Sequence, residues 1–282
     1  MTEISYKENV VRFGPGLPTV LIGERINPTG RRRFADALRE GDLTTVKTEA
    51  VRQVDAGADI LDVNVGAGGL DEPATLVAAV ELVMSTVDAA ICIDSSDASA
   101  LIAALDVYEG KALVNSVTAE EASMATILPV VAEHGAAVIA LPHDEHGIPA
   151  DPRERLAHAA RIVDAAAAAG IPSTDVVVDC LCMPVGADQQ AAARALETLR
   201  LVRAELGVAT TAGASNISFG LPERPTLNLA FLAMAIDAGL AAPITDVTVP
   251  GLRRLCRASD VLASRDARCR RYVADYRRYP SQ

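Results

Sequence analysis

The chain has 282 residues, a formal net charge of −11 and a 50% share of hydrophobic side chains; only 3% are aromatic and none is tryptophan. This length corresponds to one large domain or two ordinary ones, and the apolar share suffices to bury a substantial core. The negative charge argues against nucleic acid as a main ligand, because phosphate binding favours a basic surface. No apolar run reaches the about 20 residues that span a bilayer and no signal-peptide pattern is present, so we expect a cytoplasmic protein without membrane contact.

Eight short runs rich in valine, isoleucine and leucine recur along the chain and predict β-strands. They cover residues 19–27, 58–65, 89–95, 112–117, 136–142, 175–181, 210–217 and 243–250. Continuous apolar strands of this kind are typical of a parallel sheet that is buried on both faces.

Segments with the apolar spacing of helices separate these strands, as at residues 43–57, 72–87, 153–170 and 189–207. Glycines that favour a helix end precede the next strand at Gly57, Gly110, Gly135, Gly170 and Gly207. Eight such units favour a single α/β domain, a (β/α)8 TIM barrel over residues 19–282 after an N-terminal extension of residues 1–18. The competing fold is an open doubly wound sheet, but GERINPTG after the first strand is not its GxGxxG phosphate turn.

Cysteine and arginine usage gives two further expectations. Cys180 and Cys182 would point to one face of a strand, and we expect buried free thiols rather than metal ligands, because further ligands with recurrent spacing are missing. The last thirty or so residues carry many arginines at helical spacing, Arg257 and Arg265 among them, which predicts a solvated helix face.

Polar residues end most of the predicted strands. They are Glu24, Arg25, Asn27, Asp62, Asn64, Asp94, Ser95, Ser96, Asn115, Ser116, Asp179, Ser215, Asn216 and Asp246. In a barrel these positions meet at the C-terminal face, where active sites are built. Any one of them could instead cap a helix or a turn. A ring of carboxylates and amides with few cations suits a flat heterocycle with many donors and acceptors better than a phosphate group.

Several motifs resemble one family along nearly the whole chain, from about residue 20 to residue 265. They are GERIN, LDVNVG, CIDS, VNSV, HGAAVIAL, VVDCL and GASNISFGLPERP. Together they resemble the methyltetrahydrofolate–corrinoid methyltransferases, which belong to the pterin-binding barrel superfamily with dihydropteroate synthase and the folate domain of cobalamin-dependent methionine synthase.

The resemblance implies roles for the strand-end residues. Asp94, Asn115 and Asp179 match the family residues that bind the pterin, and Asp62 and Asn64 complete the pocket. Asn216 matches the asparagine beside the methyl-bearing N5, which makes it the expected catalytic residue; its amide can donate a hydrogen bond without bringing a charge. Ser215 and Arg224 are placed in the same substrate site, and for Arg224 a solvated loop position stays open.

The resemblance also implies the partners. Methyl-tetrahydrofolate or tetrahydrofolate is the expected substrate. The chain carries no recognisable cobalamin-binding module, so the corrinoid (cobalamin) is expected on a separate protein; a homodimer is common in the superfamily. One departure is Asp179-Cys180-Leu181, where family members often have Asp-Pro-Leu. This leaves the aspartate in place but puts the geometry of the turn in doubt.

Other interpretations stay open at this point. A dihydropteroate synthase-like condensing enzyme is disfavoured because NPTGRRRF replaces that family's first loop and no Ser-x-Arg-x-His is present. A non-catalytic pterin-binding subunit of a methyltransferase complex is the second alternative. His143 and His146 with Asp144 and Glu145 suggest a polar loop rather than a metal site, and Arg31–Arg33 could meet a folate tail, an acidic partner or solvent. The sequence leaves open the direction of methyl transfer, the partner and the exact pterin.

Overall fold

The centre of the protein is a closed ring of parallel strands. In this computed structural model, which describes residues 1–278, eight strands form the barrel. In chain order they are β3 (Ile22–Ile26), β4 (Ile60–Asn64), β5 (Ala90–Asp94), β7 (Leu113–Thr118), β8 (Ala137–Leu141), β9 (Val176–Asp179), β10 (Ala209–Gly213) and β11 (Ala242–Thr245). The ring closes where β11 pairs with β3, which confirms the predicted (β/α)8 barrel.

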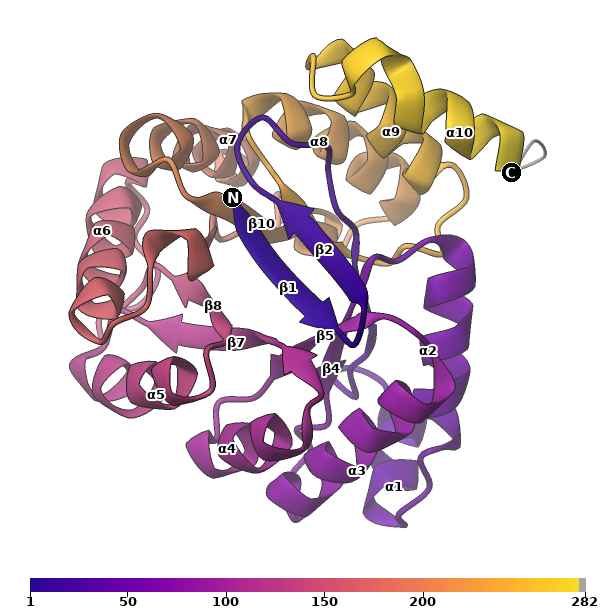
Figure 1. Cartoon of the computed structure of the whole chain (residues 1–282). Helices are drawn as coiled ribbons and strands as arrows, with labels where there is room; N and C mark the ends of the chain where they lie inside the picture. Colours follow the sequence, from indigo (N-terminus) through magenta and orange to yellow (C-terminus); the bar gives the residue numbers. More distant parts are fainter. Residues whose placement is uncertain (279–282) are drawn as a thin grey trace.

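Helices surround this ring and return the chain from one strand to the next (Figure 1). They are α1 (Arg32–Arg39), α2 (Thr44–Ala56), α3 (Glu72–Thr86), α4 (Ala98–Val107), α5 (Glu121–Glu133), α6 (Pro152–Ala168), α7 (Ala191–Leu201), α8 (Arg224–Ala238), α9 (Leu252–Leu262) and α10 (Arg270–Arg278). The Asp-Glu-Pro at residues 71–73 explains how α3 begins: the Asp71 side chain accepts from the Ala74 N–H, and proline occupies the first turn. All four predicted helical segments are confirmed.

The first residues form a hairpin across one end of the barrel. Strands β1 (Thr2–Tyr6) and β2 (Asn9–Phe13) pair antiparallel, and β6 (Gly110–Lys111) adds a short third strand. Ile4 and Phe13 of the hairpin are buried in the same cluster as the barrel-interior residues Ile60 and Ile139. Figure 1 shows the hairpin lying across the ring of strands. The apolar interior is thus covered at the N-terminal ends of the strands, and the polar strand ends lie at the opposite face.

Gly110 corrects one sequence expectation. Gly57 ends α2 in the left-handed conformation, as predicted, but Gly110 is part of β6 rather than a helix end. A Cβ atom at Gly110 would lie 2.3 Å from the carbonyl oxygen of Ser5. Glycine is needed there because the backbone of β1 passes too close for a side chain.

The cysteine and arginine expectations are each partly confirmed. Cys180 and Cys182 are buried free thiols, as predicted, but both lie in the turn beyond the end of β9 at Asp179 rather than on a strand. Arg257 and Arg265, however, are only 5% and 8% exposed. Their guanidinium groups donate to the backbone carbonyls of Thr19 and Leu240 at 2.9 Å and 2.7 Å. These two arginines tie the C-terminal segment to the barrel, because each satisfies a buried carbonyl group.

Candidate active site

The polar strand ends gather in levels set by the strand register. Asn64 pairs in register with Asp94, and Asp94 with Asn115, so these three residues share one level across β4, β5 and β7. Asp62 precedes Asn64 by two residues, points to the same side and lies one level deeper, in register with Cys92. The predicted gathering of these four residues at one end of the barrel is present.

Their side chains contact one another directly. The Asn115 amide nitrogen Nδ2 donates to Asp62 Oδ1 at 3.2 Å. Burial raises the pKa of Asp62 well above its ordinary value, and the charge of Asp94 adds to the rise. Burial also raises the pKa of Asp94 to about 6, although a hydrogen bond from Asn64 opposes the shift. Both carboxyl groups therefore hold a proton more strongly than an ordinary aspartate does.

Asp179 lies at the end of β9 and is 8% exposed. Its Oδ1 accepts from the Leu181 N–H at 2.7 Å. Burial raises its pKa, whereas backbone hydrogen bonds from Leu181 and Gly213 lower it. The turn that follows has Leu181 at a positive φ of 53° and is supported from outside by Arg155. Arg155 Nη1 donates to the carbonyl oxygens of Cys180 and Leu181 at 3.2 Å and 2.9 Å.

The segment that carries Asn216 is a short helix, which corrects the prediction of a strand over residues 210–217. Strand β10 ends at Gly213, and Ala214–Ser218 form the 3-10 helix η3. The side chain of Asn216 is exposed and lies beside Gly213, where a Cβ atom would meet Asn216 Nδ2 at 2.8 Å. Asn216 thus stands above the end of its strand rather than within the sheet.

Arg224 supports this short helix. Its Nη2 donates to the carbonyl oxygen of Ser215 at 2.8 Å, and its Nε donates to Ser218 Oγ at 3.0 Å. Ser215 is buried, and its hydroxyl lies 3.3 Å from Thr245 Oγ1 on β11. Ser215 and Arg224 thus lie at the predicted site, and their hydrogen bonds hold the segment that carries Asn216. Contact of either residue with a substrate stays a prediction.

Glu24 belongs to the site although the family resemblance assigned it no role. It is half-buried in the middle of β3. Burial raises the pKa of Glu24 to about 7; the Ser215 hydroxyl offsets part of this rise, and the Asp246 carboxylate adds to it. Asp246 itself lies 3.6 Å from Arg25 Nε. Glu24 is thus an acid that changes charge near neutral pH and faces the segment that carries Asn216.

A hollow of about 510 Å³ lies beside the polar ends of β5 and β7, where Asp94 and Asn115 line it. Its lining is rich in hydroxyl groups and includes Asp94, Ser95, Asn115, Ser116, Thr118, Glu120, Ser123 and Thr126. This is the size of a small-molecule pocket, with polar groups that can fix the orientation of a ligand.

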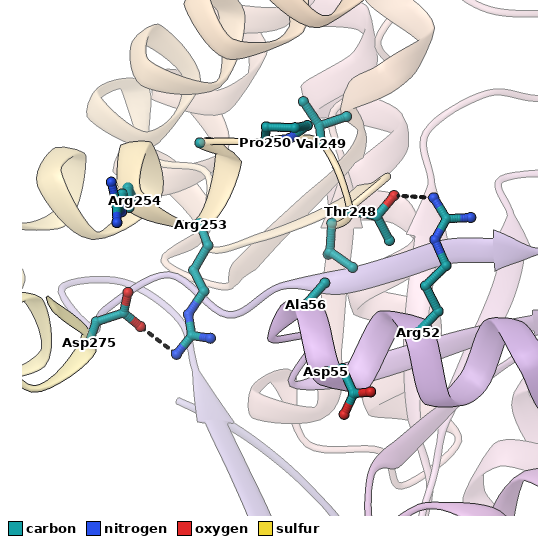
Figure 2. A pocket seen from close by; sticks show the side chains of 11 residues that line it. Arg52, Asp55, Ala56, Thr248, Val249, Pro250, Arg253, Arg254 and Asp275 are labelled. Carbon is teal, nitrogen blue, oxygen red and sulfur yellow. Dashed lines mark hydrogen bonds and ion pairs between the residues drawn. The ribbon is translucent and has the colours of Figure 1, made fainter. Parts of the chain in front are cut away.

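A second pocket, of about 360 Å³, lies outside the barrel between α2 and the β11–α9 segment. Figure 2 shows Arg253 paired with Asp275 in it, and the Arg52 guanidinium hydrogen-bonded to Thr248 at 2.7 Å. The ring residues Asp62, Asp94, Asn115 and Asp179 are not in its lining. Asp94 and Asn115 line the hollow beside β5 and β7, whereas Asp62, Asp179 and Asn216 are in the lining of neither pocket. The polar strand ends, with the hollow that adjoins them at Asp94 and Asn115, are therefore the candidate ligand site.

The histidine loop and the arginine loop named in the sequence analysis have their own contacts. Asp144 accepts a hydrogen bond from the backbone N–H of His146 at 2.9 Å and lies 3.8 Å from His158 Nε2. Residues 1–278 contain no group of three or more histidine, cysteine or acidic side chains arranged to hold a metal ion. Arg31 pairs with Glu49 at 2.7 Å, whereas the Arg32 side chain is 96% exposed. Within the same residues no helix is long and apolar enough to cross a membrane.

Two solved structures that share this fold are dihydropteroate synthases. The enzyme of Xanthomonas albilineans in complex with 7,8-dihydropteroate has a TM-score of 0.69 at 19% identity, over 92% of this chain and 98% of that one. The Yersinia pestis enzyme, solved with a pterine-sulfa conjugate, has a TM-score of 0.68 at 16% identity, over 94% and 99% of the two chains. At these identities the likeness establishes the barrel fold.

Sequence relatives are closer. The methionine synthase of Mycobacterium tuberculosis is 32% identical over 262 residues, which is 86% of this chain; the chain spans only 22% of the length of that protein. The methylcorrinoid:tetrahydrofolate methyltransferase of Eubacterium limosum is 27% identical over 266 residues, 92% of this chain and 96% of that protein. Residues 23–246 match the pterin binding enzyme family, so the chain belongs to that family, as its motifs predicted.

Proposed function

We propose that this protein transfers a methyl group between N5 of methyl-tetrahydrofolate and the cobalt of a corrinoid carried on a separate protein. The observation that carries the proposal is the exposed side chain of Asn216 on a short helix, at the same barrel end as the half-buried Asp94 and the buried Asp179. The match along nearly the full length of the Eubacterium limosum methyltransferase supports it.

The acidic and amide side chains would fix the pterin in one orientation. Asp94 and Asp179 carry carboxyl oxygens that accept from the ring N–H and amino groups of a pterin. Asn115 can both donate and accept, so it suits a ring edge on which the two kinds of group alternate. Holding the ring in one plane favours transfer because it fixes N5 relative to the approaching cobalt.

Asn216 would act at the reacting nitrogen. In the transfer from folate, the cobalt(I) electron pair attacks the methyl carbon, the N5–CH₃ bond breaks and a Co–CH₃ bond forms. A tertiary amine is a poor leaving group, so N5 must gain a hydrogen bond or a proton as the methyl group departs. A donor that acts most strongly when this charge develops lowers the barrier without binding the ground state more tightly.

The proton that N5 retains must come from an acid, because an asparagine amide does not release one at neutral pH. Glu24 fits this need: it faces Ser215, the residue before Asn216, and its pKa is raised to about 7 by burial. An acid with a pKa near the working pH is the most effective donor or reservoir. In our proposal Glu24 holds the proton that the methyl transfer consumes.

The main alternative, a dihydropteroate synthase-like condensing enzyme, has the fold in its favour and the loops against it. The chain continues from β3 as Asn27-Pro28-Thr29-Gly30-Arg31, and it follows β11 with Asp246-Val247-Thr248-Val249-Pro250. Neither contains the motifs of that enzyme. The Arg31 side chain is also already paired with Glu49.

Product identification separates the two activities. The purified protein is given methyl-tetrahydrofolate with cob(I)alamin in one reaction. In another it is given 6-hydroxymethyl-7,8-dihydropterin pyrophosphate with p-aminobenzoate, and the products of both are identified by mass spectrometry. Methylcobalamin in the first reaction alone supports methyl transfer, whereas dihydropteroate in the second alone rejects it. Folate binding with neither product indicates the non-catalytic subunit.

A further inference from the structure

Two carboxyl groups lie next to each other among the polar strand ends. Asp62 on β4 and Asp94 on β5 share a side-chain hydrogen bond. The strand register pairs Asp62 with Cys92 and Asp94 with Asn64, so the two aspartates meet diagonally. Asp62 is 3% exposed, whereas Asp94 is half-buried and one level closer to the mouth. The contact is therefore built by two inward-pointing side chains from neighbouring strands.

A hydrogen bond between two carboxyl groups requires a proton, because an ionised carboxylate is an acceptor only. The surroundings indicate which group holds it. Asp62 Oδ1 accepts from Asn115 Nδ2 at 3.2 Å, which leaves its other oxygen to donate to Asp94. Asp94 also has a hydrogen bond from Asn64 and more access to water, both of which favour its ionised form.

We propose that Asp62 is a protonated positioning residue, which accepts from Asn115 and donates to Asp94 so that Asp94 stays an ionised acceptor aimed at the ligand. The proton assignment concerns the protein alone, while the identity of the ligand as a pterin rests on the proposed function. In this arrangement each polar group of the chain Asn115–Asp62–Asp94 has a partner, which a buried network requires.

The ionisable groups that face the pair do not favour a second negative charge. The Cys92 thiol on β5 contacts Asp62, and Glu72 on α3 lies near Asp94. Glu72 also accepts a hydrogen bond from Ser95 Oγ, the residue after Asp94. Burial and the Asp94 charge both raise the pKa of Asp62 above its ordinary value. Because Asp62 is the more deeply buried of the two and Asp94 the more open to water, the shared proton is assigned to Asp62.

Infrared difference spectroscopy tests the proton without any ligand. The test uses a Glu24→Gln background, because Glu24 also carries a proton near pH 7. In that background the protein at pH 7 should show the carbonyl stretch of a protonated carboxylic acid, shifted in D₂O, and adding Asp62→Asn should remove it. Absence of the band in the Glu24→Gln protein, or an unchanged band after Asp62→Asn is added, would overturn the proposal. Asp179→Asn serves as the control that removes a different buried acid at the same barrel end, and circular dichroism shows whether each variant folds.

Calorimetry with 5-methyl-tetrahydrofolate tests the positioning role. An amide can replace a neutral acid, donating to Asp94 and accepting from Asn115, so Asp62→Asn should bind within about threefold of the wild type. Asp62→Ala and Asp94→Asn should each weaken binding by about 10- to 100-fold, the effect of losing a hydrogen bond to a charged group. Equal loss in Asp62→Asn and Asp94→Asn would reject the positioning role. If the wild type binds no folate, the proposed function fails, while the infrared result still decides where the proton lies.

Discussion

Arg155 on α6 donates a hydrogen bond of 2.9 Å from Nη1 to the carbonyl oxygen of Leu181, two residues beyond Asp179. The same nitrogen lies 3.2 Å from the Cys180 carbonyl, and Nε donates to Pro149 at 2.8 Å. The turn after β9 lacks the proline common in related enzymes, and a buried guanidinium group holds its backbone instead. The position of Asp179 thus depends on a residue 24 positions earlier in the chain.

Arg155→Ala should destabilise the protein and weaken folate binding. Removing a buried group that satisfies three carbonyls is expected to lower the free energy of unfolding by about 3 kcal/mol. Chemical denaturation measures this loss. Arg153→Ala is the matched control, because Arg153 is exposed and pairs with Glu205 at the surface, and its effect should stay within about 0.5 kcal/mol. Equal effects of the two variants would show that Arg155 does not support the turn.

Glu24→Gln should change how methyl transfer depends on pH. The pKa of Glu24 is raised to about 7, so its proton is present below that pH and is lost above it. Transfer from methyl-tetrahydrofolate consumes a proton, so the wild-type rate should fall as pH rises through about 7. The Glu24→Gln variant should transfer the methyl group more slowly than the wild type at low pH, and its rate should not fall as pH rises through about 7. Single-turnover rates from pH 5.5 to 8.5 measure it, with the exposed Glu223→Gln as control. Superimposable profiles for Glu24→Gln and wild type would remove Glu24 from the reaction.

Asp94→Asn should be more stable than the wild type at neutral pH while binding folate poorly. Burial raises the pKa of Asp94 from 3.8 to about 6, so between these values the folded protein holds a proton that the unfolded chain has lost. The unfolding free energy of the wild type therefore falls as pH rises through this window. In Asp94→Asn this contribution is absent, because an amide does not titrate. At about 1.4 kcal/mol per pKa unit, the variant should gain up to about 3 kcal/mol relative to wild type between pH 4 and pH 7. Urea unfolding at both pH values measures this, and a pH-independent difference would contradict it.

Arg224→Ala separates two roles of Arg224. If it supports η3 through Ser215 and Ser218, the variant should lower kcat for methyl-tetrahydrofolate and for a methyl-tetrahydropterin without the glutamate tail alike. If the residue binds the tail, only KM for the full substrate should rise. Lysine cannot reproduce the two-pronged contact of a guanidinium group, so Arg224→Lys should recover little activity. Steady-state kinetics with both substrates decides between the roles.

The barrel and most of its polar ring could be predicted because both follow from short-range patterns. Continuous apolar runs indicated the strands, and residues two apart, such as Asp62 and Asn64, necessarily point to the same side. The 3-10 helix at Asn216 could not be predicted from the sequence pattern, because no proline or change of period marks Gly213 as the point where the chain leaves the sheet. The role of Arg155 arises from contacts between distant segments, and the hydrogen bond between Asp62 and Asp94 arises from the packing of two strands. Neither is visible in local sequence.

The most direct test of the central claim mixes the protein with methyl-tetrahydrofolate and cob(I)alamin and follows the cobalt spectrum in a single turnover, for the wild type and for Asn216→Ala. We expect the cobalt(I) band to disappear as methylcobalamin forms with the wild type. Asn216→Ala should be slower by about 100-fold or more, as when a transition-state donor is removed, while its folate Kd changes far less. A wild-type protein that binds folate but leaves the cobalt(I) band unchanged, or an Asn216→Ala variant that loses folate binding but not rate, would contradict the proposed methyl transfer by this site.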